Sequence, residues 1–178
     1  MSNVRHREIF VERVLYERDR FEQLLNRVGY ARRMTLKGVA GKWSVKDALA
    51  YIWAHEQYLA DRMHEILHHQ PYTPCKTQSA LDAFLDEFGY PDFGSPLLDA
   101  NATAEWVVER YSHVSLDDLV AQEIEAFCSI VSALDNMQED ALRQHNLYHR
   151  IPKHTYERYR ESAHPIRRWL KVNGAPNK

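Results

Sequence analysis

The sequence predicts an all-α protein, a four-helix bundle with a short crossover helix and a loop between its middle helices. Four long stretches place apolar residues three and four positions apart, which is the spacing of one helix face. No stretch alternates apolar and polar residues as a half-buried strand does. The chain has 178 residues, of which 44% are hydrophobic, and this is enough for a single domain with a core over about residues 4–172.

The first helix is expected from about Val4 to about Val28, and Gly29 is a suitable stop. Charged residues fill the faces that its apolar residues leave open. Those apolar residues are Ile9, Val11, Val14, Leu15, Phe21, Leu24, Leu25 and Val28. A basic loop is expected next, over residues 32–42.

The second helix is expected from Ser44 to about His69. Ser44 can cap it, because its hydroxyl can accept a backbone N–H of the first turn while Asp47 reaches back in a capping box. One apolar stripe consists of Val45, Leu49, Ile52, Leu59, Met63 and Ile66. A second stripe, aromatic and polar, consists of Tyr51, His55, Tyr58 and Arg62. A helix with both stripes can pack in a bundle and line a cavity at once.

The middle of the chain predicts the crossover. Residues 77–88 read as a short helix, and residues 89–96 as a turn-rich loop that contains aromatic side chains. A third helical region is expected to start near residue 97 and to reach residue 113.

The last third of the chain predicts two more helices. Residues 115–118 resemble a second capping box and open a strongly periodic helix that ends near residues 135–136. Residues 142–153 are expected to be irregular, and the last helix is expected over about residues 154–172. Pro165 lies inside that helix and should bend it.

Composition and charge argue against two classes of function, nucleic-acid binding and membrane insertion. The formal net charge of −2 gives no electrostatic case for nucleic-acid binding, which usually requires a basic patch. No run of 18 apolar residues predicts a membrane span, and the first seven residues lack the apolar core of a signal peptide. We therefore expect a cytoplasmic protein that binds neither nucleic acid nor a membrane.

Cysteine usage predicts no metal or redox motif. The two cysteines, Cys75 and Cys128, are far apart in the sequence. Cys128 lies in an apolar helical run and is expected to be buried, whereas Cys75 follows a proline in a loop and is expected to be exposed.

Four motifs suggest a family. They are Trp43–Asp47 with the following Leu49–Glu56, then Leu98–Asn101, Ser115–Leu119, and Arg158–Tyr159 through Ile166–Leu170. In this order, over about residues 5–171, they resemble the DinB-like superfamily, and most of all its ClbS/DfsB branch. The resemblance implies a four-helix bundle of the DinB/YfiT-like type.

The resemblance also implies a function without a metal ion. Many superfamily members bind a divalent metal through three histidines, and the positions that correspond to them here are Tyr51, Arg158 and Ser162, none of which is histidine. No metal ligand and no cofactor are therefore predicted. Some proteins of the ClbS/DfsB branch protect their producer from a reactive small molecule, by binding it or by opening a strained ring.

The predicted catalytic residues are Tyr51, His55 and Arg158. If the second and fourth helices face each other as in the family, these residues converge with Ser162 in one pocket. A cationic Arg158 would favour the ionised form of the Tyr51 phenol, and His55 would titrate near neutral pH, so the set could orient a water for general-base attack. The alternative is that Tyr51 is an ordinary buried tyrosine and that Arg158 pairs with a carboxylate such as Glu56 or Glu123.

The predicted substrate-binding residues are Trp43, Tyr58, Tyr90, Phe93 and Ser162. Tyr90 and Phe93 lie in the loop at the expected open end of the bundle, where they could cover an apolar ligand. Ordinary packing is the alternative explanation for these aromatic side chains.

Two other functions stay open. The chain could be a non-catalytic ligand-binding module or a dimeric scaffold, because related bundles often pair as homodimers. It could also be a metal-dependent hydrolase or transferase, since it contains ten histidines. A rearranged metal site would combine His55 with His149 or His154 and with Glu123. Whether the protein is an enzyme is thus left open, and a small-molecule ligand is the expected partner.

Overall fold

The computed structural model describes residues 2–29, 31–69 and 100–174, and the statements below concern these residues. Apart from one isolated bridge between Ala40 and Trp43, the regular structure in these ranges is helical, which confirms the all-α prediction. The crossover predicted over residues 77–96, with Tyr90, Phe93 and Cys75, lies outside the described residues. No described helix combines the length and apolar character that a membrane span requires.

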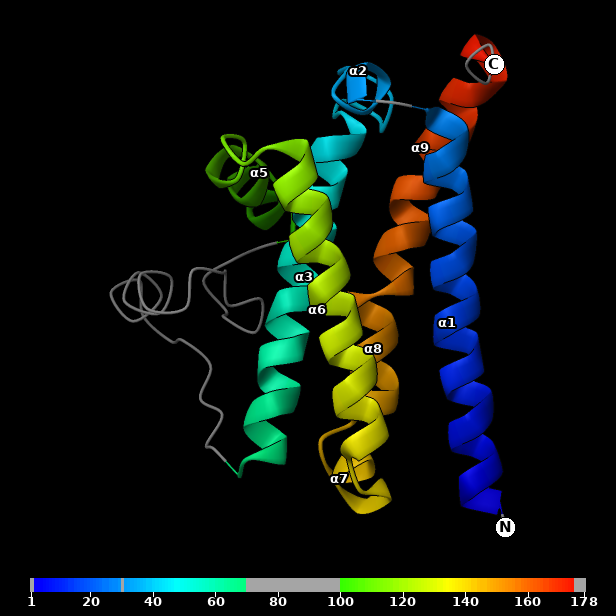
Figure 1. Cartoon of the computed structure of the whole chain (residues 1–178), viewed down its shortest axis with the longest axis vertical. Coiled ribbons are helices and arrows are strands. Elements are labelled where there is room, and N and C mark those ends of the chain that lie inside the picture. Colours follow the sequence, from blue (N-terminus) through cyan, green and yellow to red (C-terminus); the bar gives the residue numbers. More distant parts are fainter. Residues whose placement is uncertain (1, 30, 70–99, 175–178) are drawn as a thin grey trace.

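The long helices run along the long axis of the molecule. Figure 1 shows α1, α3 and α6 in this direction, with α8 and α9 following one another along it. The described helices are α1 (Ser2–Val28), α2 (Ala31–Met34), α3 (Val45–Leu67), α5 (Ala100–Arg110), α6 (Leu116–Asn136), α7 (Glu139–Gln144), α8 (Leu147–His154) and α9 (Tyr156–Asn173). The helices predicted over about residues 4–28, 44–69 and 115–136 correspond to α1, α3 and α6, and their ends agree with the structure to within about two residues.

The start of α3 is fixed by the predicted capping box. The Ser44 hydroxyl accepts the backbone N–H of Asp47 at 3.1 Å, and the Asp47 carboxylate accepts the backbone N–H of Ser44 at 2.9 Å. At α6 the Ser115 hydroxyl accepts the backbone N–H of Asp118 at 3.1 Å. These contacts satisfy N–H groups that the first helical turn leaves without partners.

The core is built around α3. This helix packs along α6 and also contacts α5, α8 and α9, while α1 packs mainly against α9. Its apolar stripe is buried as predicted, through Val45, Leu49, Ile52, Leu59 and Met63. Because α3 contacts most of the other helices, the side chains on its remaining faces also point into the protein interior.

The prediction that residues 142–153 are irregular is wrong. These residues belong largely to α7 and α8, which a turn at Asn146, with φ of 54°, joins. The side chains of Leu147 and Ile151 are one helical turn apart and fully buried, so core packing holds α8 in a helical conformation. Thr155, with φ of −122° and ψ of −99°, separates α8 from α9, so the last helix begins at Tyr156 instead of residue 154.

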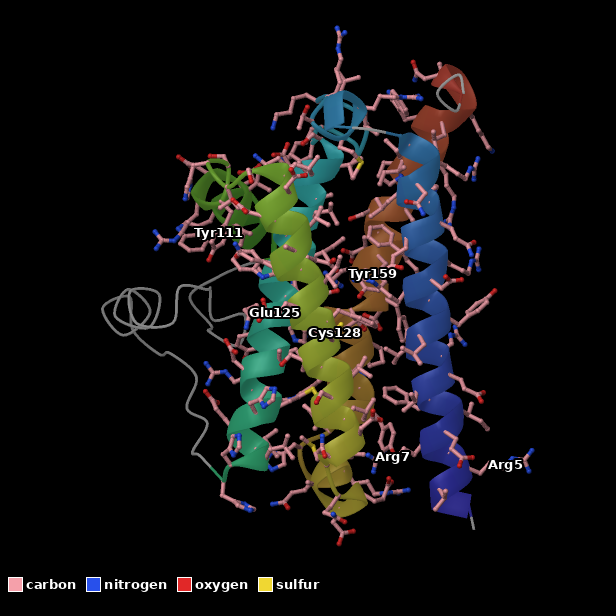
Figure 2. The ribbon with its side chains drawn as sticks, viewed as in Figure 1. Arg5, Arg7, Tyr111, Glu125, Cys128 and Tyr159 are labelled. Carbon is pink, nitrogen blue, oxygen red and sulfur yellow. The ribbon has the colours of Figure 1, made fainter. Side chains whose placement is uncertain are left out.

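The prediction that Cys128 is buried is also wrong, because its side chain is exposed on α6 (Figure 2). The neighbouring Phe127 is buried, and one residue corresponds to a rotation of about 100° around a helix. Ile124 lies one turn before Cys128 and is 45% exposed, so both belong to the outer face of α6. The apolar run around Cys128 in the sequence does not show which of its residues lie on the buried face of α6 and which on the outer face.

Candidate functional site

The aromatic and polar stripe of α3 forms one continuous row of side-chain contacts. The rings of Trp43 and Tyr51 have centroids 6.2 Å apart, and those of Tyr51 and His55 are 4.6 Å apart and nearly perpendicular. His154 enters the row from α8, with its ring 5.0 Å from that of His55. The spacing of three and four residues on α3 therefore produces the shared face that the sequence predicts.

The row continues toward the C-terminal end of α3. The rings of His154 and Tyr58 are 5.4 Å apart, and the Arg62 guanidinium lies 5.3 Å from the centre of the Tyr58 ring. Tyr58, Arg62 and His154 are each less than 8% exposed. This part of the row is thus a buried surface of two rings and one cation.

His55 and His154 form a hydrogen-bonded pair. Their Nδ1 atoms are 2.8 Å apart, and both side chains are buried. One Nδ1 must therefore carry the hydrogen while the other accepts it. Burial lowers the pKa of His55 well below 6.5 and that of His154 to about 3, and nearby cations, including Arg158 and Lys153, lower both pKa values further.

Both histidines are therefore neutral at pH 7. The expectation that His55 titrates near neutral pH is wrong, because the protein interior and the surrounding positive charges disfavour the imidazolium.

Arg158, on α9, adjoins the other end of the row. It forms a hydrogen bond with Tyr51, and its guanidinium pairs with Glu161 at 3.0 Å and approaches Glu157 at 4.0 Å. Arg158 thus pairs with a carboxylate, as the alternative expects, but the partner is Glu161 and not Glu56 or Glu123. Burial raises the pKa of Tyr51 more than Arg158 lowers it, so the phenol stays protonated and its expected ionisation is also wrong.

The structure brings most of the predicted site residues together. Trp43, Tyr51, His55, Tyr58 and Arg158 belong to the row or adjoin it. Ser162 is half-buried one turn after Arg158 on α9, and no described contact joins it to the histidine pair. Tyr90 and Phe93 lie outside the described residues.

A cleft opens beside the row, between α3 and α8. Its volume is about 300 Å³, at the lower end of the range of small-molecule sites. The polar and aromatic side chains that line it include Tyr58, Arg62, His149, Arg150, Lys153 and His154. His154 therefore belongs both to the histidine pair and to the wall of this α3–α8 cleft.

A second buried polar group, the Arg18 network, lies on another side of α3. It joins Arg18 of α1, Glu56 of α3, Glu123 of α6 and Tyr159 of α9. Arg18 donates to Glu123 through both terminal nitrogens, one contact being 2.7 Å long, and its Nη1 lies 3.5 Å from Glu56 and 3.3 Å from the Tyr159 hydroxyl. Figure 2 labels Tyr159 on α9. Four helices thus meet at one guanidinium.

The charges of the Arg18 network are unequal. The Tyr159 hydroxyl donates to Oε1 of Glu56, while Oε2 of Glu56 faces no hydrogen-bond donor among the described residues. Burial and the neighbouring Glu123 raise the pKa of Glu56 well above 4.5. Burial therefore favours the protonated form of Glu56, and Arg18 is neutralised mainly by its two-atom contact with Glu123.

Sequence reasoning named His154 beside His55 only as an alternative metal ligand, and it missed both the hydrogen bond between these two residues and the Arg18 network. A signal for the network was present, because Arg18 interrupts the buried stripe of Val14 and Phe21, and Glu123 interrupts that of Leu119 and Phe127. A charged residue at an apolar position of a periodic helix indicates a buried ion pair.

The described residues do not fit the alternative metal site. Among them no group of three or more His, Cys, Asp or Glu side chains is arranged to hold a metal ion. His55 and His154 come together as that alternative requires, but Glu123 pairs with Arg18 instead. Arg158, Lys153 and Arg150 also surround the histidine pair with positive charge, which disfavours a bound cation.

No protein-family model, curated protein or solved structure matches this chain. The similarity of its motifs to the DinB-like superfamily and the function derived from it therefore stay predictions.

Proposed function

We propose that the chain is a four-helix bundle of the DinB-like type, similar to the ClbS/DfsB branch. It protects the cell that produces it from a small reactive molecule, which it binds without a metal ion. The parallel course of α1, α3, α6 and the consecutive helices α8 and α9 supports the bundle (Figure 1). So does the Arg18 network, because its four members come from α1, α3, α6 and α9.

The observation that carries the proposed binding is the position of His154. This residue is hydrogen-bonded to His55 on one side and lines the α3–α8 cleft on the other. A neutral imidazole offers hydrogen-bonding nitrogens, and the adjacent ring of Tyr58 offers a flat apolar surface. A small molecule with one aromatic or unsaturated part and one polar group fits this pair of side chains.

Ring opening is the catalytic form of the same proposal. Since the Tyr51 phenol stays protonated, it can donate its proton to the oxygen of a strained ring, and Arg158 would stabilise the phenolate that forms. Water then adds to the ring carbon and returns a proton to the phenolate, so the sum is addition of one water. Tyr51 acts here as an acid, in place of the general-base role that the sequence predicts.

The non-catalytic alternative is favoured by one specific observation. The pKa of His154 is lowered to about 3, and a group with so low a pKa accepts a proton from water only weakly. Without a base, the site would bind its ligand and hold it, and would not turn it over.

Styrene oxide, a strained-ring electrophile, distinguishes the catalytic form of the proposed function from the binding-only form. We expect wild-type protein to accelerate formation of the diol and the Tyr51→Phe variant to lose that activity with an unchanged melting temperature. Equal activity in Tyr51→Phe would contradict the acid role. A rise in melting temperature with the diol product, without turnover, would support the binding-only form. The absence of both turnover and any such rise would contradict the proposed function for this class of ligand.

A further inference from the structure

Basic residues are concentrated in two segments of the chain that contain no acidic residue. Residues 23–46 and 162–174 include no Asp or Glu, although the whole chain has 25 of them. The basic residues are Arg27, Arg32, Arg33, Lys37, Lys42 and Lys46 in the first segment and Arg167, Arg168 and Lys171 in the second. The small net charge of −2 therefore does not show how unevenly charge is distributed.

The two basic segments lie side by side in the structure. Figure 1 shows α2 and the last turns of α9 at the same end of the molecule. The Arg33 guanidinium lies 4.5 Å from the centre of the Trp169 ring, and its Nη2 donates to the backbone carbonyl of Gly174 at 2.7 Å. The loop that contains Gly38 borders a groove together with Trp169. The positive charges of both segments therefore act on one surface.

Four cations of this surface have no acidic partner among the described residues. They are Arg32, Arg33, Arg168 and Lys171. Arg33 contacts a carbonyl and an aromatic ring, and Arg168 contacts the ring of His164, so neither meets a carboxylate. Arg33 is half-buried and the other three are exposed. We call the surface that these four residues form the basic end.

The neighbouring lysines differ from these four cations. Lys37 forms an ion pair with Asp47, and Lys42 forms one with Glu105 at 2.6 Å. Their charges are therefore compensated locally, and the four residues of the basic end supply the positive charge that is available to a partner.

Two aliphatic side chains are exposed beside these cations. Leu36 is 49% exposed and follows Arg33 by three residues, and Val172 is 83% exposed and follows Lys171 directly. One exposed apolar side chain is ordinary on a protein surface. Aliphatic side chains together with arginine and lysine are typical of surfaces that lie in the headgroup layer of a membrane.

We propose that the basic end binds the surface of an anionic lipid membrane. Its four cations contact the phosphate and carboxylate groups of the lipids, and Leu36 and Val172 enter the interface. Such a peripheral contact requires no membrane-spanning helix. It differs from the absence of membrane binding that the charge of the whole chain predicts, because only the local charge meets the lipids.

A nucleic acid fits the basic end less well than a membrane. Single strands are bound by stacking of their bases on accessible aromatic rings. Trp169 is half-buried and its ring is already in contact with Arg33. The exposed side chains of Leu36 and Val172 would also have no part in contacts with a phosphate backbone.

Sedimentation of full-length protein with lipid vesicles tests the proposed contact. We expect binding to phosphatidylcholine vesicles that contain about 30% phosphatidylserine, and at least about tenfold weaker binding to phosphatidylcholine alone. Raising the salt concentration from about 0.1 M to about 1 M should remove most of the binding, because the Debye length falls from about 10 Å to about 3 Å.

Charge-matched variants locate the contact on the protein. Arg168→Gln/Lys171→Gln removes two cations of the basic end and should weaken binding to the anionic vesicles about tenfold or more. The control Arg5→Gln/Arg20→Gln removes the same charge from exposed residues of α1, and Arg5 lies near the other end of that helix (Figure 2). This control should keep the affinity within about twofold, and both variants should keep the wild-type melting temperature.

The aliphatic part of the contact is tested separately. Leu36→Ser/Val172→Ser leaves every charge in place and should weaken binding to the anionic vesicles about threefold or more, because it removes the apolar area that enters the interface. Unchanged affinity of this variant would contradict entry of Leu36 and Val172 into the membrane interface.

Three further results would overturn the proposed membrane contact. Equal binding to anionic and neutral vesicles, or to neither, would show that the protein does not recognise anionic lipid. An equal loss of affinity in Arg5→Gln/Arg20→Gln and Arg168→Gln/Lys171→Gln would show that the basic end is not the contact surface. Binding of oligothymidine without binding of vesicles would make the basic end a nucleic-acid surface instead.

Discussion

The Nδ1 atoms of His55 and His154 lie 2.8 Å apart in the protein interior, so one hydrogen bond joins α3, in the first half of the chain, to α8, in its last third. The pair connects the predicted site around Tyr51 to the α3–α8 cleft. Because both imidazoles are neutral, the pair acts as a hydrogen-bonding surface and carries no charge of its own at pH 7.

Removing either histidine should destabilise the protein by leaving the other ring buried without its partner. We expect His55→Ala and His154→Ala each to lower the free energy of unfolding by about 1–3 kcal/mol. The double variant should cost less than the sum of the two, with a coupling of about 0.5 kcal/mol or more. Urea denaturation measures all three.

The exposed His149→Ala variant serves as the control and should change the free energy of unfolding by less than about 0.5 kcal/mol. Strictly additive costs for His55→Ala and His154→Ala would contradict a bond between the two rings.

Stability should fall as the pH is lowered through the range in which free histidine titrates. The pKa of His154 is about 3 in the folded protein against 6.5 ordinarily, so between these values the unfolded chain binds a proton that the folded protein does not. The stability that the neutral histidines contribute is therefore complete above about pH 6.5. Below that pH the free energy of unfolding falls by about 1.4 kcal/mol per pH unit for each histidine of the pair.

The His55→Ala/His154→Ala variant isolates this effect. Its free energy of unfolding should depend less steeply on pH than that of the wild type between about pH 6 and pH 4, whereas His149→Ala should keep the wild-type slope. The same slope in the double variant and the wild type would show that these histidines titrate normally in the folded state.

Glu56 and Glu123 should respond differently to the same substitution. Burial favours the neutral form of the Glu56 carboxyl, and Glu56→Gln replaces that form with a neutral amide of similar shape, so we expect it to cost less than about 1 kcal/mol of stability. Glu123→Gln removes the charge that pairs with buried Arg18 and should cost about 3–5 kcal/mol. Thermal and urea denaturation measure the loss of stability in each variant. A larger loss for Glu56→Gln than for Glu123→Gln would show that Glu56, and not Glu123, carries the charge that pairs with Arg18.

Cys128 should react with thiol reagents in the native protein. In a Cys75→Ser background it is the only cysteine, and its exposed position on α6 predicts that iodoacetamide modifies it without denaturant. Mass spectrometry reports the modification. Protection of Cys128 until the protein is unfolded in urea would mean that this face of α6 is covered.

Local sequence signals predicted the helices well. The capping box at Ser44 and Asp47, and the stripe from Val45 to Met63, depend on residues close together in the chain, and both occur as expected. Residues 142–153 were mispredicted because their helical state depends on burying Leu147 and Ile151 against other helices, which is a tertiary effect.

The site was predicted only in part, for a related reason. Tyr51, His55 and Tyr58 share a helix face, so their proximity follows from spacing on α3 alone. Placing His154 against His55 requires the packing of α8, 99 residues away, and the protonation states depend on burial that the sequence does not specify. The sequence therefore predicted a lowered pKa for Tyr51, where the structure raises it, and missed the lowered pKa of His55.

The nitrogen NMR signals of the His55 and His154 rings at pH 7, measured on untagged protein purified without chelator, test the central claim most directly. A neutral ring has one protonated and one unprotonated nitrogen, which give widely separated signals, and we predict this pattern for both residues. Two similar nitrogen signals would show an imidazolium, and a signal shifted by a bound metal ion would show a metal site. Either result would contradict a neutral histidine pair beside the ligand cleft.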